Sequence, residues 1–231
     1  MTYPLQNRLA LITGGSSGIG FAIAEKLAAN GIEVTIADVV PPSKIIPHIT
    51  YKYCDVTKGE DVDKLFADML PNLPNVLVLS AGKGIHERLT EGDPEKWKDV
   101  LDLNIMGLLR CIRAFVPAMQ EKQNGNVVFI SSVAANKPYA YGGVYTASKA
   151  AINSIAETLR METMPHIAVS TVQAGITNTH FFKDRADKDS MMQHTGSLHA
   201  KDIADDVFYI ISQPPGKTIN TIITRPSGQE F

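Results

Sequence analysis

Short apolar runs alternate with longer amphipathic stretches along the whole chain, and few architectures accommodate this alternation. The runs are typical of buried strands and comprise residues 8–13, 33–38, 51–55, 76–81, 126–131, 168–174 and 221–226. Because helical stretches separate most of them, we expect parallel strands with helices packed on both faces of the sheet. The sequence contains no internal repeat, low-complexity tract or linker, so it predicts an α/β fold with one domain over residues 1–231.

Local signals indicate where several helices begin and end. A helix over 18–30 should stop at Gly31, because glycine readily adopts the left-handed conformation found after helix C-termini. Thr57, followed three residues later by a glutamate, has the spacing of a capping box and is expected to be an N-cap. Asp93 followed by Pro94 predicts another helix start.

Composition and charge exclude several classes of function. With 231 residues, 44% of them hydrophobic, the chain can bury a sizeable core. A net charge of −2 gives no basis for a nucleic-acid surface. The longest apolar region, residues 101–119, is interrupted by charged side chains and should not span a membrane. Because two cysteines fit a reducing environment better than a disulfide scaffold, we expect a cytoplasmic protein.

A glycine-rich turn follows the first predicted strand and precedes the first predicted helix. Glycines let a backbone turn tightly and approach a pyrophosphate, while the helix N-terminus offers free N–H groups to an anion. The alternative is an ordinary tight connection between a strand and a helix. The context favours a dinucleotide site built from Gly14, Ser16, Ser17, Gly18, Ile19 and Gly20.

The end of the second predicted strand carries a carboxylate, Asp38, which lies 24 residues after Gly14. A carboxylate there can accept hydrogen bonds from an adenosine ribose and repels a 2′-phosphate. Neither Ser16 nor Ser17 is basic, and Val39 follows Asp38, so no cation is present to hold that phosphate. NAD(H) is therefore favoured over NADP(H). The alternative is that Asp38 is an ordinary turn residue at a strand end.

A phenol and an ammonium group lie four residues apart at Tyr145 and Lys149, in a helix expected to run to about residue 162. Side chains with this spacing share one helical face, so the two can act on one object. Such a pair also occurs by chance on solvated helices. Its meaning therefore depends on the other motifs of the chain.

The glycine turn, a serine thirteen residues before Tyr145, and Lys149 together resemble the short-chain dehydrogenase/reductase family. The resemblance covers essentially the whole chain. It implies a three-layer, doubly wound parallel sheet of the Rossmann type and hydride transfer between NAD(H) and a secondary alcohol or its ketone, including small hydroxy acids. It assigns the catalytic roles to Asn104, Ser132, Tyr145 and Lys149.

The resemblance also assigns further contacts to the dinucleotide. Asp55 and Val56 match the stretch that contacts the adenine, and the backbone of Ala81 and Gly82 passes close to the cofactor. A loop containing Gly175, Thr177 and Thr179 matches the one that covers the nicotinamide. Tyr145 and Lys149 contact the cofactor as well.

The chain departs from the family pattern at three places. Leu79 and Ser80 replace two asparagines, which removes a pair of buried amides near the cofactor. Ala174 replaces a proline, so we expect a less rigid nicotinamide loop. Prolines at 41, 42 and 47 predict that the helix usual between the second and third strands is missing.

Alcohol oxidation needs a base for the hydroxyl proton, and ketone reduction needs the corresponding acid. Tyr145 fits this role if the Lys149 ammonium lowers the phenol pKa from about 10 to around 7. Ser132 would hydrogen-bond the substrate oxygen, and Asn104 would interrupt its helix to hold a water in a proton relay. The alternatives are that Ser132 caps a strand end and Asn104 is a helix-surface amide.

The polar, irregular stretch 180–198 follows a predicted strand, so it is a candidate substrate lid; a solvated helix is the alternative. We expect no metal site, because His180, His194 and His199 lack the spacing of a metal pair.

The expected partners are a small-molecule alcohol or ketone and further copies of the chain. The stretch 101–119 carries five apolar residues that would form an interface of a dimer or tetramer if exposed: Leu108, Leu109, Ile112, Phe115 and Val116. The rival functions are a non-catalytic dinucleotide sensor or scaffold of the same fold and an NADP-linked ketone reductase.

Overall fold

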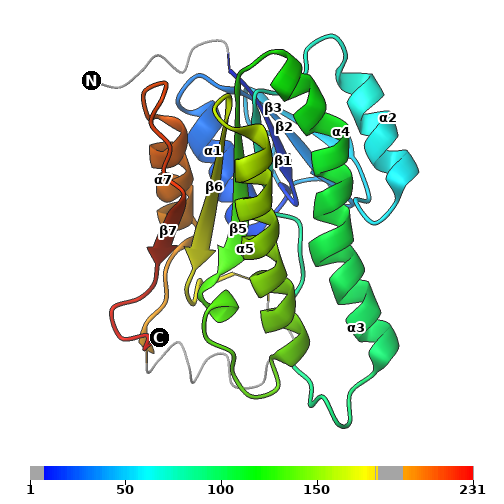
Figure 1. The fold of residues 1–231 in the computed structure, drawn as a ribbon, viewed down its shortest axis with the longest axis vertical. Helices are drawn as coiled ribbons and strands as arrows, with labels where there is room; N and C mark the ends of the chain where they lie inside the picture. The colour runs from blue at the N-terminus through cyan, green and yellow to red at the C-terminus, as the bar shows by residue number, and fades with distance from the viewer. Residues whose placement is uncertain (1–7, 180, 182–194, 231) are drawn as a thin grey trace.

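The computed structural model describes residues 8–179, 181 and 195–230, and its strands form a single parallel sheet (Figure 1). The sheet has seven strands in the order β3-β2-β1-β4-β5-β6-β7. The strands are β1 (Leu9–Thr13), β2 (Glu33–Asp38), β3 (Ile49–Tyr53), β4 (Val76–Leu79), β5 (Gly125–Ser132), β6 (Ile167–Ala174) and β7 (Thr221–Thr224). All the expected strands are present, although β3 begins two residues earlier than the apolar run at 51–55.

Helices cover both faces of the sheet, which gives the expected three layers. They are α1 (Gly18–Ala28), α2 (Gly59–Met69), α3 (Pro94–Leu101), α4 (Leu108–Glu121), α5 (Gly143–Thr163) and α7 (Ala200–Ile211). A π-helical segment, Asp102–Gly107, joins α3 to α4, and one 3-10 turn, Val133–Ala135, follows β5. Helices α1 and α7 pack on one face, whereas α2, α4 and α5 pack on the other (Figure 1).

The alternation of side chains along each strand divides the core between these two faces. On β1, Ala10 and Ile12 pack among residues of α1 and α7, while Leu11 packs among residues of α2, α4 and α5. Because the central strands are covered on both sides, they are apolar throughout rather than alternating with polar residues. This is why they were recognisable as continuous apolar runs.

The helix-start signals are confirmed in part. Asp93 caps α3 by accepting a hydrogen bond from the backbone N–H of Glu95 at 3.0 Å, with Pro94 in the first turn. Gly31 follows α1 with a φ of 81°. The assignment of Thr57 was wrong, because the N-cap of α2 is Lys58. The Thr57 hydroxyl instead donates to the Asp55 carboxylate at 2.7 Å. The hydroxyl is therefore engaged by Asp55 and does not cap the helix.

The strand order creates the crevice in which a ligand can bind. The chain moves outward from β1 to β3 and then returns to β4 on the other side of β1. Connections beyond β1 and β4 therefore diverge, and in such sheets ligands bind outside the carboxyl ends of the strands at this point. As expected, the described residues 39–48 between β2 and β3 contain no helix.

The structure overturns the argument for an apolar surface patch on α4. Leu108, Phe115 and Val116 are buried in the core of the chain, between 1% and 7% exposed, and Leu109 and Ile112 pack partly against the same core. Their apolar character is thus explained by the sheet that α4 covers. Assembly into a dimer or tetramer remains a prediction without this support.

In the part of the chain that the structure describes, no helix is long and apolar enough to cross a membrane.

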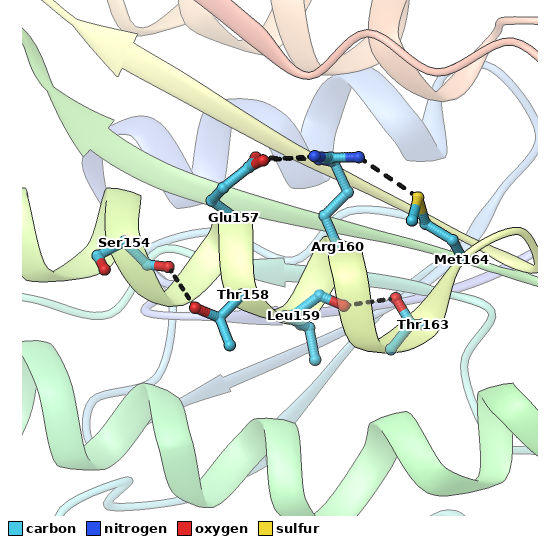
Figure 2. Close-up of polar contacts among 7 residues, drawn as sticks. All are labelled: Ser154, Glu157, Thr158, Leu159, Arg160, Thr163 and Met164. Atoms are coloured by element: carbon cyan, nitrogen blue, oxygen red, sulfur yellow. Dashed lines mark hydrogen bonds and ion pairs between the residues drawn. The ribbon is translucent and has the colours of Figure 1, made fainter.

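The second half of α5 holds itself together through side-chain contacts (Figure 2). The hydroxyls of Thr158 and Thr163 donate to the backbone carbonyls one turn earlier, at 3.1 and 2.8 Å. Arg160 forms an ion pair with Glu157 and also donates to the sulfur of Met164 (Figure 2). These contacts lie in the second half of α5, whereas the expected catalytic pair lies in its first half.

Two isoleucines test how the core is distributed. Ile12 in β1 is 0% exposed, whereas Ile45 in the β2–β3 connection is 96% exposed. Ile12→Ala should lower the free energy of unfolding by about 2–5 kcal/mol, through lost burial and the cavity left behind. Ile45→Ala should change it by less than about 0.5 kcal/mol. Urea unfolding of both variants checks this, and similar losses would contradict the described packing.

Candidate active site

A pocket of about 1060 Å³ opens at the carboxyl ends of the central strands. It is lined by the glycine turn, the ends of β2, β4, β5 and β6, and the first half of α5. Of the proposed cofactor residues it contains Gly14, Ser17, Gly18, Ile19, Gly20, Asp38, Asp55, Val56, Ala81, Gly82, Tyr145, Lys149, Gly175, Thr177 and Thr179. Ser16 is not among the lining residues.

The glycine turn has the geometry of a phosphate cradle. Gly14 has a φ of 65°, and a Cβ there would lie 2.7 Å from the Cα of Ala81, so only glycine fits between the two strand ends. Gly18 has a φ of 53° where the turn enters α1. Ser17 is the N-cap of α1 but makes no capping hydrogen bond. The first N–H groups of the helix therefore remain available to an anion, which fits a pyrophosphate.

Ser16 is not positioned to contact a ligand through its side chain. Its hydroxyl oxygen is buried, has no hydrogen-bond partner in the part of the chain described, and does not line the pocket. The fit of the turn to a dinucleotide therefore rests on its glycines and on the N-terminus of α1.

Asp38 has two roles at the end of β2. One carboxylate oxygen accepts from the backbone N–H of Ser16 at 3.0 Å, and the other accepts from that of Val40 at 3.3 Å. The carboxylate thus fastens the glycine turn to the second strand and also lines the pocket. The bond to Val40 is the ordinary turn role considered for this residue, so the two interpretations coexist. The bond to Ser16 was not foreseen.

Asp55, which was expected near the adenine, is held by hydrogen bonds from Thr57. Asp55 accepts from the backbone N–H of Thr57 at 3.0 Å as well as from its hydroxyl. Burial acts to raise the pKa of Asp55, but the hydrogen bonds from Thr57 and the nearby charges of Lys58 and Arg110 hold it below its ordinary value. The group is therefore an anion at neutral pH. Next to it, burial raises the pKa of the Cys54 thiol to about 12.

The two family asparagines replaced by Leu79 and Ser80 are compensated in part. Leu79 packs in the core, and the Thr13 hydroxyl accepts from the backbone N–H groups of Ser80 and Ala81, both at 3.2 Å. These two hydrogen bonds fix the position of the backbone where the chain leaves β4. The backbone of Ala81 and Gly82 accordingly lines the pocket as expected.

Ser132, Tyr145 and Lys149 meet on the floor of the pocket. Ser132 ends β5, and the other two lie in the first half of α5; all three are buried, at 8%, 5% and 6% exposed. The Ser132 hydroxyl hydrogen-bonds the Tyr145 phenol. It also accepts from the backbone N–H of Ala134 at 3.1 Å, so its strand-end role is real too. The helix-surface interpretation of Tyr145 and Lys149 is wrong.

The protonation of the pair differs from the expectation. Burial raises the pKa of the Tyr145 phenol; the hydrogen bond from Ser132 opposes this and Tyr139 adds to it. Burial also lowers the pKa of Lys149 to about 8. The lysine ammonium donates to the Ile130 carbonyl at 2.9 Å and lies 5.8 Å from the centroid of the Tyr145 ring. Desolvation therefore dominates the pKa of both groups, and the phenol is protonated at neutral pH.

Asn104 lies in the π-helical segment and is 1% exposed, which excludes a helix-surface role. Its amide clamps Lys83, accepting from the backbone N–H at 2.9 Å and donating to the carbonyl at 3.0 Å. It also donates to the Ser148 hydroxyl at 3.0 Å, which in turn donates to the Tyr145 carbonyl at 2.7 Å. Asn104 does not line the main pocket but borders a cavity of about 10 Å³ behind it. The proposed water relay stays a prediction.

Several pocket residues escaped the sequence analysis. Tyr139 and Gln229 line the pocket, as do the half-buried Lys83 and the exposed Lys137, whereas Phe181, which also lines it, belongs to the candidate lid 180–198. The rings of Tyr145 and Phe181 lie 5.9 Å apart. Ser148 immediately precedes Lys149 but does not line the pocket. It was missed because its role depends on its contact with Asn104, which the sequence does not reveal. None of the others belongs to a motif with fixed spacing, so no local signal could have identified them.

The candidate lid is only partly accessible to description, because His180 and residues 182–194 lie outside the described residues. Phe181 and Thr195, which flank that gap, both line the pocket. Leu198 pairs with Thr177 beyond β6, and the backbone N–H of His199, the N-cap of α7, donates to the Asp202 carboxylate at 2.7 Å. No group of three or more potential metal ligands occurs among the residues that the structure describes.

Burial of Lys149 generates a prediction about stability. Between pH 8 and 10.5 the unfolded chain keeps a proton on this lysine that the folded chain has lost, so folded stability rises with pH in that window. Lys149→Met should be about 3 kcal/mol more stable than the native protein at pH 7, and the difference should shrink toward pH 10. Urea unfolding measures it, with the exposed Lys201→Met as a control that should show no such gap. A constant difference across this range would contradict the burial of a charge.

Comparisons with known proteins identify the family of the chain. A family model described as short chain dehydrogenase matches residues 8–190. An uncharacterized oxidoreductase of Staphylococcus saprophyticus is 31% identical over 96% of this chain and 98% of its own. Dehydrogenase/reductase SDR family member 11 of Mus musculus is 28% identical, over 97% of this chain and 96% of its own.

The same relationship appears in three dimensions. The closed form of a serine dehydrogenase, complexed with NADP+, matches with a TM-score of 0.89 and 26% identity over 96% of both chains. An alcohol dehydrogenase of Thermococcus sibiricus, complexed with 5-hydroxy-NADP, shares the fold at 23% identity, with a TM-score of 0.84 over 96% of this chain and 98% of its own. The family model and the bacterial relative together show that this protein belongs to the short-chain dehydrogenase family of oxidoreductases.

Proposed function

We propose that the protein transfers hydride between NAD(H) and a small secondary alcohol or its ketone, with Tyr145 as the acid and base. The observation that carries this proposal is the meeting of Ser132, Tyr145 and Lys149 beside the glycine turn in one pocket. A sensor or scaffold would not need a buried lysine whose charge destabilises the fold. The substrate class includes small hydroxy acids, for which the 26% identity to a serine dehydrogenase is the support.

The residues of the chain have distinct roles in this reaction. The glycine turn and the first N–H groups of α1 would hold the pyrophosphate, with Asp38 near the adenosine ribose. The bound nicotinamide would supply or accept the hydride. Ser132 orients the substrate oxygen by a hydrogen bond, and Tyr145 gives its phenolic proton to that oxygen in reduction or takes it back in oxidation. Lys149 supplies a positive charge that favours the phenolate whenever it is protonated.

A second candidate is the same chemistry with NADP(H). It is supported by the serine dehydrogenase structure, which contains NADP+, and by the contacts of Asp38, whose two oxygens already accept backbone N–H groups. We favour NAD(H) because a carboxylate at this strand end repels a 2′-phosphate and no basic side chain in the turn offsets that repulsion. We also propose that the protein acts in the cytoplasm as a dimer or tetramer.

Cofactor preference tests the role of Asp38. NADH should bind at least tenfold more tightly than NADPH, a difference of about 1.4 kcal/mol. The double variant Asp38→Ser with Val39→Arg removes the repulsive charge and adds a cation, so it should shift the preference toward NADPH. Calorimetric titration of both cofactors against both proteins measures this. Equal affinities in the native protein would exclude the repulsive role.

The acid–base role of Tyr145 predicts different pH behaviour in the two directions. Because its pKa is raised, reduction, which needs the protonated phenol, should not depend on this group through neutral pH. Oxidation needs the phenolate, so its kcat/KM should rise with pH through the neutral and alkaline range and should not level off below the pKa of a free phenol, about 10. Tyr145→Phe should lose about a hundredfold or more of kcat in both directions while still binding NADH.

The matched control is Tyr209→Phe on α7, whose ring is 55% exposed and outside the pocket. Its activity should equal that of the native protein at every pH. Retention of most activity by Tyr145→Phe, with the same pH profile, would rule out the mechanism.

A further inference from the structure

The segment after β7, residues 225–230, folds back against the loop that leaves β6. The Arg225 guanidinium donates to the backbone carbonyl of Gln229, and the backbone N–H of Gln229 donates to the Pro226 carbonyl at 3.0 Å. The strand that precedes it is anchored as well, because the Thr224 hydroxyl donates to Asp206 on α7 at 2.5 Å. This turn gives the Gln229 side chain a defined position on the wall of the pocket.

The loop after β6 is held by this returning segment at two successive amides. The backbone N–H of Gly175 donates to the Thr224 carbonyl at 2.7 Å, which continues the pairing of β6 with β7. The next amide, Ile176, donates to the side-chain oxygen of Gln229 at 2.9 Å. Gln229 therefore supplies the hydrogen-bond acceptor for the first loop amide beyond the pairing of β6 with β7. Without it, the Ile176 N–H would lose its partner at the point where the loop turns into the pocket.

The same contact requires a glycine at position 175. A Cβ at this position would lie 2.5 Å from the side-chain oxygen of Gln229 and 2.8 Å from the Cα of Arg225. The absence of a side chain at Gly175 thus allows Gln229 to reach Ile176. This accounts for the glycine by close approach of another segment, since its φ is not in the left-handed region.

The contact also bears on the expectation that Ala174, in place of a proline, leaves the loop less rigid. A proline at that position would stiffen the loop from within, and this chain lacks it. Here a hydrogen bond from a segment more than fifty residues away supplies the constraint instead. The loop that it holds carries Thr177 and Thr179, which line the pocket.

We propose that Gln229 is a positioning residue that fixes the loop 175–179 for cofactor binding and hydride transfer. The inference rests on the proposed function for its effect on catalysis, but the clamp on Ile176 stands on its own geometry. Gln229 acts through the loop backbone, so its removal should alter the precision of the site while leaving the sheet and core intact. Its role is separable from general stability for this reason.

The test compares three variants with the native protein. Gln229→Ala removes the acceptor, Gln229→Glu keeps an acceptor oxygen in the same place, and Gln213→Ala is the matched control. Gln213 also makes one side-chain hydrogen bond, to the Tyr209 carbonyl at 2.7 Å, but does so on an exposed helix end outside the pocket. The readouts are amide hydrogen exchange at Ile176, NADH and NADPH affinity by fluorescence titration, and kcat and KM with ketone substrates.

Gln229→Ala should speed exchange of the Ile176 amide about fivefold and weaken binding of the preferred cofactor by a similar factor, the loss expected for one hydrogen bond of about 1 kcal/mol. It should lower kcat as well, while amides of β1 and β4 keep their native exchange. Gln229→Glu should stay within about twofold of native, and Gln213→Ala should be unchanged.

Three results would overturn the proposal. Native exchange at Ile176 in Gln229→Ala would show that the clamp does not hold the loop, and a uniform increase over the sheet would show a merely structural role. Faster exchange at Ile176 with unaltered cofactor affinity and kcat would remove the link to catalysis. If the native protein itself binds neither NADH nor NADPH, the proposed function fails as well, whereas the exchange measurement still decides whether the clamp exists.

Discussion

The burial of the Lys149 ammonium beneath the Tyr145 ring is the interaction on which the rest of the site depends. A lysine that is only 6% exposed, with its pKa lowered to about 8, costs the fold about 3 kcal/mol. A hydrophobic residue there would avoid this cost. The chain tolerates it because the surrounding structure fixes both side chains: the Ile130 carbonyl binds the ammonium, and Ser132 hydrogen-bonds the phenol. Charges of this kind concentrate at functional sites.

The architecture explains how such a pair reaches a ligand. The strand order reverses between β1 and β4, which opens a crevice at their carboxyl ends. Gly14 and Ala81 close the two sides of this crevice to within a distance that excludes a side chain. Asn104 then connects the loop after β4 to α5 through Ser148, so the helix with the catalytic pair is registered against the same strand end. The glycine turn and the proposed acid–base group are thereby parts of one framework.

Local patterns in the sequence were sufficient to predict the sheet and the glycine turn, and the family resemblance predicted the convergence of Ser132, Tyr145 and Lys149. They failed where partners distant in the sequence compete. Thr57 has the spacing of an N-cap, but Asp55 takes its hydroxyl. The apolar positions of α4 suggested an interface, but the sheet covers Leu108, Phe115 and Val116. Gln229 and Ser148 act through contacts that only the folded chain creates. The direction of the Tyr145 pKa depends on burial, which residue spacing cannot supply.

Hydride transfer itself provides the most direct test of the central claim. The native protein is incubated with a panel of ketones and hydroxy-acid precursors, using NADH or NADPH that carries deuterium at the transferable position of the nicotinamide. The account predicts that the former carbonyl carbon of one product gains the deuterium, and that Tyr145→Phe forms almost none of that product although it still binds the cofactor. Deuterium transfer at the native rate by Tyr145→Phe, or product lacking the label, would contradict it.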